Sequence, residues 1–87
     1  MDIDWSTEKN DVLKRDRGLD LEILAESIES GDVLEVALNP NYPGQVIFMI
    51  LVGEYVCAVP AVPTEDGYFL KTAYKSRKLN KRFNGGD

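Results

Sequence analysis

The sequence predicts a small α+β domain in which helices pack on a twisted antiparallel sheet. The chain has 87 residues, which is the size of one domain, 1–87, with a single hydrophobic core. Apolar residues follow a helical period in the first third of the chain and a strand-like alternation in much of the rest. Short turn-forming segments separate the expected strands, so we expect successive strands to pair as antiparallel neighbours.

The N-terminal third is expected to form a short strand at residues 3–5 and then two helices. Ser6 or Thr7 is positioned to cap the first helix, and Gly18 is positioned to end it. The second helix follows the cap residue Asp20 and places apolar residues at positions i, i+3, i+4 and i+7, a spacing typical of one buried helix face. These apolar residues are Leu21, Leu24, Ala25 and Ile28.

Four strands are expected after Gly31, where the period of apolar residues becomes alternating. Their expected ranges are residues 33–38, 45–52, 55–59 and 68–74. The second of them is apolar almost throughout, which is typical of a strand buried on both faces. Residues 39–44 are rich in Asn, Pro and Gly and therefore predict the loop that precedes it.

The remaining segments complete the order β-α-α-β-β-β-β-α. Residues 53–54 predict a two-residue hairpin turn. Pro60 and Pro63 are expected to limit pairing of the strand before them, because proline has no N–H to donate. Ser76 is positioned to cap a basic C-terminal helix, and residues 84–87 after it are expected to fray.

Composition excludes several classes of site. The chain has no histidine and one cysteine, Cys57, so it offers no internal disulfide, no Cys/His zinc site and no histidine-based nucleophile system. We therefore expect neither a metal nor a cofactor. The longest apolar run, residues 46–52, is too short for a membrane span, and the N-terminus lacks the apolar stretch of a signal peptide. These features predict a cytoplasmic protein without membrane contact.

The charge is distributed unevenly along the chain. The net charge of −5 by itself argues against a nucleic-acid partner. Residues 18–70, however, hold nine acids and no Lys or Arg, whereas residues 71–82 hold six cations and no acid. The other four cations precede Gly18. If folding gathers the two basic groups, they would form a basic pocket on an otherwise negative body.

Several motifs resemble the BrnT-like toxins of bacterial toxin–antitoxin pairs, and the resemblance covers essentially the whole chain. The motifs are Ile3, Trp5, Glu8, Lys9 and Asn10 at the start, Arg17, Gly18 and Leu19 after the first helix, and residues 69–78 near the end. The resemblance implies a RelE-like fold and a ribonuclease that inhibits translation. It also implies a cognate antitoxin encoded by an adjacent gene. The chain would contact DNA only indirectly, through this antitoxin.

The chain departs from the family pattern in two places. Tyr74 occupies the position where relatives usually have arginine, and Arg17 occupies the position where they usually have histidine. Both changes bear on cleavage. They leave open a second hypothesis, in which the chain is a non-catalytic relative that keeps the fold and acts as a protein-binding module.

RNA cleavage without a metal requires a base for the 2′-hydroxyl, a cation for the charge that develops on the phosphate, and an acid for the leaving 5′-oxygen. Without histidine, Lys71 and Tyr74 are the candidates for proton transfer, provided that the strand ends or bends before Tyr74. Arg77 is the candidate phosphate clamp, since a guanidinium binds two oxygens at once. The further RNA-binding candidates are Lys14, Arg17, Lys78, Lys81 and Arg82.

Other interpretations of these residues stay open. The C-terminal cations also fit an ordinary solvated helix face. Trp5 fits a core anchor better than a base-stacking residue, and Tyr42 fits an exposed contact for a partner. Cys57 fits inert packing in an apolar strand. The pair formed by Gly85 and Gly86 would fit a ubiquitin-like tail, although it follows a helix and not a strand.

Overall fold

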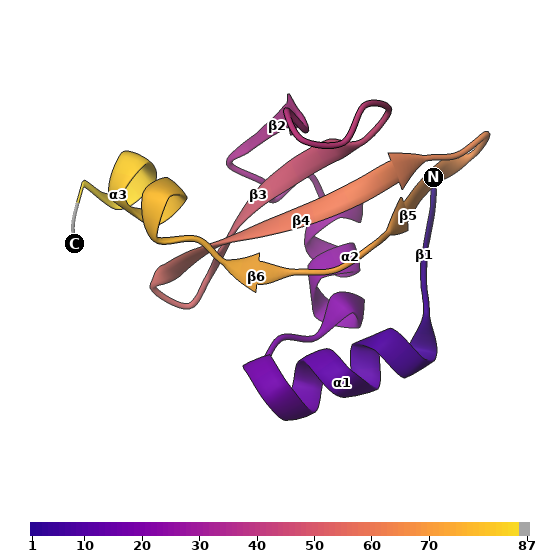
Figure 1. Ribbon diagram of the computed structural model, residues 1–87, viewed down its shortest axis with the longest axis horizontal. Helices are drawn as coiled ribbons and strands as arrows, with labels where there is room; N and C mark the ends of the chain where they lie inside the picture. The colour runs from indigo at the N-terminus through magenta and orange to yellow at the C-terminus, as the bar shows by residue number, and fades with distance from the viewer. Residues whose placement is uncertain (86–87) are drawn as a thin grey trace.

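The computed structural model describes residues 1–85, which form three helices and one sheet of six strands (Figure 1). The elements are β1 (Asp2–Trp5), α1 (Thr7–Arg17), α2 (Leu21–Glu29), β2 (Glu35–Leu38), β3 (Val46–Val52), β4 (Tyr55–Pro63), β5 (Gly67–Leu70), β6 (Tyr74–Lys75) and α3 (Arg77–Asn84). The strands lie in the order β1-β5-β4-β3-β2, and β6 pairs with β4. The predicted fold class and element order are confirmed, with the expected last strand divided into β5 and β6.

The two N-terminal helices form where their caps predict. The hydroxyl of Ser6 accepts a hydrogen bond from the N–H of Lys9, and Gly18 ends α1 with a left-handed φ of 66°. The carboxylate of Asp20 accepts from the N–H of Glu22 at the start of α2. All four residues of the predicted apolar stripe on α2 are buried.

Helix α2 packs on one face of the sheet, and the main hydrophobic core lies between them (Figure 1). The sheet contributes Phe48, Ile50, Cys57 and Val59 to this core. Trp5 packs against the same core, which confirms its interpretation as an anchor. Cys57 is completely buried, and burial raises the pKa of its thiol, so the side chain stays protonated and serves as packing.

The sheet is antiparallel except at one edge, where β1 pairs in parallel with β5. The long connection through both helices and three strands brings β5 beside β1 in this direction. Gly67 pairs with Asp2 at the start of this contact. A Cβ atom at Gly67 would lie 1.9 Å from the backbone oxygen of Asp2, so only glycine permits this approach.

The expectation that prolines limit the pairing of β4 is wrong, because β4 pairs through Pro63. Pro60 lies opposite Ile47, and its carbonyl accepts the N–H of Lys71 at 2.8 Å. The side of Pro60 on which other residues carry an N–H therefore faces the break between β5 and β6, where the pairing of β4 with β5 has already ended. Proline is thus accommodated within this strand without the loss of a ladder bond.

The C-terminal helix is longer than expected. Asn84, which was expected to fray, is the last helical residue, and Gly85 caps α3 with a φ of 64°. Gly86, the second member of the diglycine pair, lies outside the described residues, as does Asp87. No helix in residues 1–85 is both long and apolar enough to cross a membrane.

A buried asparagine joins α1 to α2. The amide nitrogen of Asn10 donates to the carboxylate of Asp20 at 3.0 Å, and its oxygen accepts the N–H of Leu21 at 2.7 Å. The hydrogen bond from Asn10, aided by the N–H of Glu22, holds the pKa of Asp20 below its ordinary value of 3.8. The charged carboxylate therefore stabilises the junction above the unfolded pKa, and this contribution is lost as pH falls through the folded pKa.

Asp20→Ala is expected to lower the free energy of unfolding by about 1 kcal/mol at neutral pH, because the substitution removes the cap of α2. The effect should shrink as the pH falls through the folded pKa of Asp20, because the wild-type carboxylate then becomes protonated. Urea denaturation at neutral and at acidic pH measures both values. The control is Asp16→Ala, which removes only an exposed pair with Arg15 and should change stability by less than about 0.5 kcal/mol. An equal loss of unfolding free energy at both pH values would contradict the stabilising role of the charged Asp20 carboxylate.

Candidate functional site

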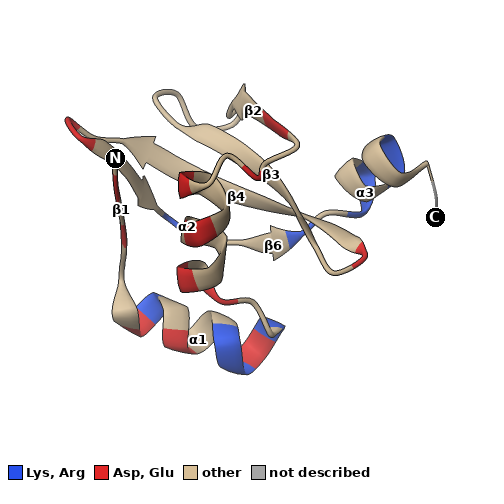
Figure 2. Ribbon diagram, turned by 180° about the vertical axis from the view of Figure 1, so that it is seen from behind, with Lys and Arg blue, Asp and Glu red and all other residues tan. Residues whose placement is uncertain are grey.

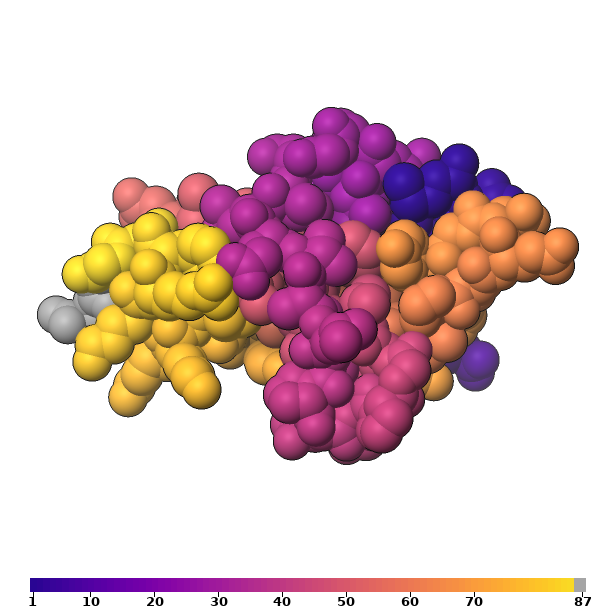
Figure 3. Space-filling view, turned by 90° about the horizontal axis from the view of Figure 1, so that it is seen from above, coloured from indigo at the N-terminus to yellow at the C-terminus, as the bar shows by residue number. Residues whose placement is uncertain are grey.

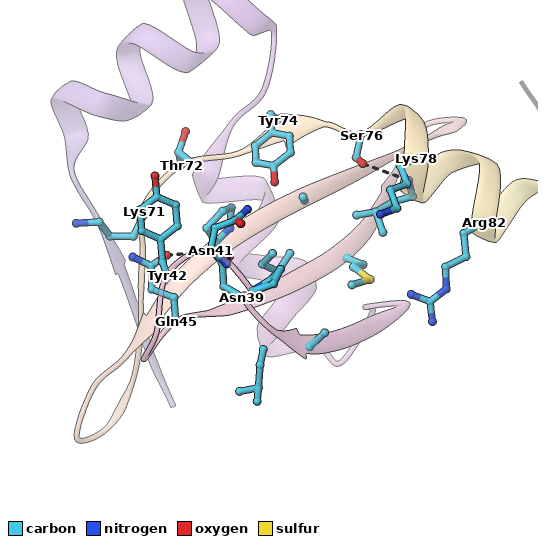
Figure 4. A pocket seen from close by; sticks show the side chains of 18 residues that line it. Asn39, Asn41, Tyr42, Gln45, Lys71, Thr72, Tyr74, Ser76, Lys78 and Arg82 are labelled. Atoms are coloured by element: carbon cyan, nitrogen blue, oxygen red, sulfur yellow. Dashed lines mark hydrogen bonds between the residues drawn. The ribbon is translucent and has the colours of Figure 1, made fainter.

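A groove of about 880 Å³ opens on the face of the sheet opposite α2 (Figure 4). Its floor consists of Ala37, Ile47, Met49, Ala58 and Pro60. One wall is the β2–β3 loop, residues 39–45, preceded by Leu38. The opposite wall follows the chain from the end of β5 into α3 and consists of Lys71, Thr72, Tyr74, Ser76, Lys78, Leu79 and Arg82.

The groove has a charge opposite to that of the whole molecule. Three cations line it, Lys71, Lys78 and Arg82, and no Asp or Glu is among the described residues that line it. The acids lie mainly on β1, α2 and the turns of the sheet, α1 carries charges of both signs, and α3 and β6 carry cations (Figure 2). Arg82 forms an ion pair with Glu35 at 2.7 Å at the rim, so Lys71 and Lys78 supply most of the uncompensated charge. This groove attracts anions.

The break between β5 and β6 brings Lys71 and Tyr74 into the same groove. β5 ends at Leu70 and β6 begins at Tyr74, so the strand is interrupted before Tyr74. This interruption is the condition under which Lys71 and Tyr74 were expected to share a face. In Figure 4 the hydroxyl of Tyr74 points into the middle of the groove, whereas the ammonium group of Lys71 lies toward its outer end. That ammonium group lies 5.7 Å from the centre of the Phe69 ring. The two side chains line one groove, but their reactive groups point apart.

Helix α3 is fixed against the edge of β4 by polar contacts at Val56. The N–H of Ser76 donates to the carbonyl of Val56 at 3.0 Å, and the side-chain oxygen of Asn80 accepts the N–H of Val56 at 3.1 Å. The hydroxyl of Ser76 also caps α3 by accepting the N–H of Leu79. These contacts hold the helix at the angle that places Lys78 and Arg82 along the wall.

The structure does not bring the other predicted cations into the groove. Arg77 is the exposed first residue of α3, and neither it nor the exposed Lys81 lines the groove. Lys14 and Arg17 lie on α1, away from α3 (Figure 1). The guanidinium of Arg17 instead donates to the carbonyl of Ala73 at 2.7 Å and thereby supports the segment between β5 and β6.

Sequence patterns did not indicate that the polar residues of the β2–β3 loop belong to the site, although Tyr42 was expected to be an exposed contact for a partner. Asn39, Asn41, Tyr42 and Gln45 line the groove, and Lys78 and Arg82 lie toward its other end (Figure 4). The density of amide side chains around Tyr42 was the available signal, but turn-forming segments contain Asn for local reasons as well. Only the pairing of β2 with β3 places this loop over the groove.

No protein-family model matches this chain, and neither the curated proteins nor the solved structures contain a match. Within residues 1–85, no three His, Cys, Asp or Glu side chains converge as a metal site requires. The interpretation of the groove therefore rests on its shape and residues.

Proposed function

We propose that this chain is a BrnT-like ribonuclease toxin that acts in the bacterial cytoplasm, cleaves RNA without a metal and thereby inhibits translation. The observation that carries the proposal is the charge of the groove. Three cations and no described carboxylate line it, although the chain has a net charge of −5. Phosphates of RNA bind in a basic cleft. The groove is therefore a place where this molecule can hold a polyanion.

The proposed reaction uses residues of the wall that contains α3. The 2′-oxygen attacks phosphorus, the bond to the 5′-oxygen breaks, and the products are a 2′,3′-cyclic phosphate and a 5′-hydroxyl. Tyr74 donates the proton to the 5′-oxygen, and the side-chain nitrogen of Lys71 accepts the 2′-hydroxyl proton after its exposed side chain rotates away from Phe69. Lys78 and Arg82 stabilise the charge that develops on the phosphate.

The proposed partner is a DNA-binding antitoxin encoded by an adjacent gene. Such a protein carries basic residues, and the exposed acids on α2, Glu22, Glu26 and Glu29, offer it a surface of opposite charge. In this proposal DNA contact occurs through the antitoxin, and the chain itself contacts RNA.

Expression of the chain alone is expected to arrest growth and degrade RNA, and co-expression of the adjacent gene is expected to relieve both effects. The purified chain should cleave a labelled RNA in the presence of EDTA. Lys78→Ala should weaken RNA binding about tenfold and reduce the slope of log affinity against log salt by about 1, because one phosphate contact is lost. Lys9→Ala is the control, since it removes an exposed cation of α1 outside the groove. Equal effects of the two substitutions would contradict RNA binding in the groove.

A protein-binding module is the second candidate function, and the edge strand β2 favours it. β2 lies at one edge of the sheet, and Leu34, which precedes it, and Val36 and Leu38 within it are exposed, Leu38 to 82%. An apolar edge strand can accept a strand from another protein. Tight binding of the neighbour-encoded protein by a chain that cleaves no RNA would support this candidate and contradict the nuclease proposal.

A further inference from the structure

We infer that the β2–β3 loop recognises bases and that the groove accepts single-stranded RNA in preference to duplex. This inference rests on the proposed RNA-binding function and adds the substrate class and a specificity-determining residue, Tyr42. The side chain of Tyr42 is 61% exposed although it is large and aromatic, and it lines the groove. Figure 3 shows the loop, in magenta, projecting from the molecule between α3 in yellow and the orange β4–β5 end.

The loop holds Tyr42 in a defined position through its own turns. The side-chain oxygen of Asn39 accepts the N–H of Asn41 at 3.0 Å, which forms an Asx turn. The N–H of Gln45 then donates to the carbonyl of Tyr42 at 3.1 Å, with Pro43 and Gly44 between them and a φ of 86° at Gly44. This is the pattern of a type II β-turn. A loop organised in this way loses little conformational entropy when a ligand binds.

The two walls of the groove differ in chemistry, and a single nucleotide strand has two corresponding sides, one of phosphates and one of bases. The wall that contains α3 offers Lys78 and Arg82 for phosphates. The loop offers the ring of Tyr42 for stacking and the amides of Asn41 and Gln45 for the hydrogen-bonding edges of bases. In a duplex the bases are stacked and paired inside the helix, so the loop would have no free base to contact. A single strand presents phosphates to one wall and bases to the other.

The test compares three fluorescently labelled oligoribonucleotides of equal length: a single strand of mixed sequence, the same strand in a duplex, and an abasic ribose-phosphate strand. The wild-type chain should bind the single strand about 10- to 100-fold more tightly than the abasic strand, because stacking requires a base. Tyr42→Ala should abolish this preference while abasic binding is unchanged, and Tyr42→Phe should retain it. Lys78→Ala should weaken binding of both strands by the same factor.

The outcomes separate this inference from the proposed function. If the single strand and the abasic strand bind the wild type equally, the groove binds phosphate and the base-recognition role of the loop is overturned. If Tyr42→Ala weakens both strands equally, or if the duplex binds as tightly as the single strand, the inference is overturned as well. If none of the three binds, the proposed RNA-binding function fails together with it. Circular dichroism of each variant establishes that the fold is retained.

Discussion

Tyr74→Phe is expected to lower the rate of RNA cleavage by about 10²- to 10⁴-fold, the usual contribution of a positioned proton donor. The substitution removes only the hydroxyl that points into the groove, and the ring can still pack on β4 opposite Ala58. Affinity for RNA should remain within about twofold, because the cations that bind phosphate are unchanged. Single-turnover cleavage and fluorescence anisotropy measure the rate and the affinity separately.

The control for this prediction is Tyr55→Phe, which removes a hydroxyl on β4 outside the groove and should leave the cleavage rate unchanged. If Tyr74→Phe cleaves at the wild-type rate, Tyr74 is not the proton donor. If it loses affinity and cleavage in the same proportion, Tyr74 binds the substrate and does not transfer a proton.

Asn80→Ala is expected to lower the free energy of unfolding by about 1–3 kcal/mol, because it leaves the N–H of Val56 without its acceptor in a buried position. Asn80 is only 6% exposed, and its oxygen also accepts the amide of Asn84. Since Asn80 fixes α3 to β4, the loss should loosen the helix that carries Lys78 and Arg82. Urea denaturation measures the stability, and hydrogen exchange at residues 77–84 measures the loosening.

Asn84→Ala serves as the matched control, because it removes an exposed amide from the same helix and leaves the contact between Asn80 and Val56 in place. It should cost less than about 1 kcal/mol. Faster hydrogen exchange throughout the sheet in Asn80→Ala, with no excess in α3, would show that Asn80 supports the fold as a whole and has no particular role in placing the helix.

The sequence alone determined the features of this protein that depend on near neighbours. The caps Ser6, Asp20 and Ser76 predicted where the helices begin, because a cap bonds to an N–H two or three residues away. The apolar stripe of α2 predicted which of its faces is buried, since the helical period is local. The concentration of cations after Leu70 likewise indicated the region from which the candidate groove takes its charge.

Tertiary structure alone decided which of those cations lie together. The exposed Arg77 and the groove residue Lys78 are neighbours in the chain, and the way Ser76 and Asn80 dock α3 on β4 separates their roles. Pro60 is tolerated because its missing N–H faces the break between β5 and β6, which depends on residues more than ten positions away. Tyr42 likewise reaches the groove through strand pairing. Such contacts join distant segments, and a sequence pattern specifies hydrogen bonds and burial only over the few residues that one turn or strand repeat spans.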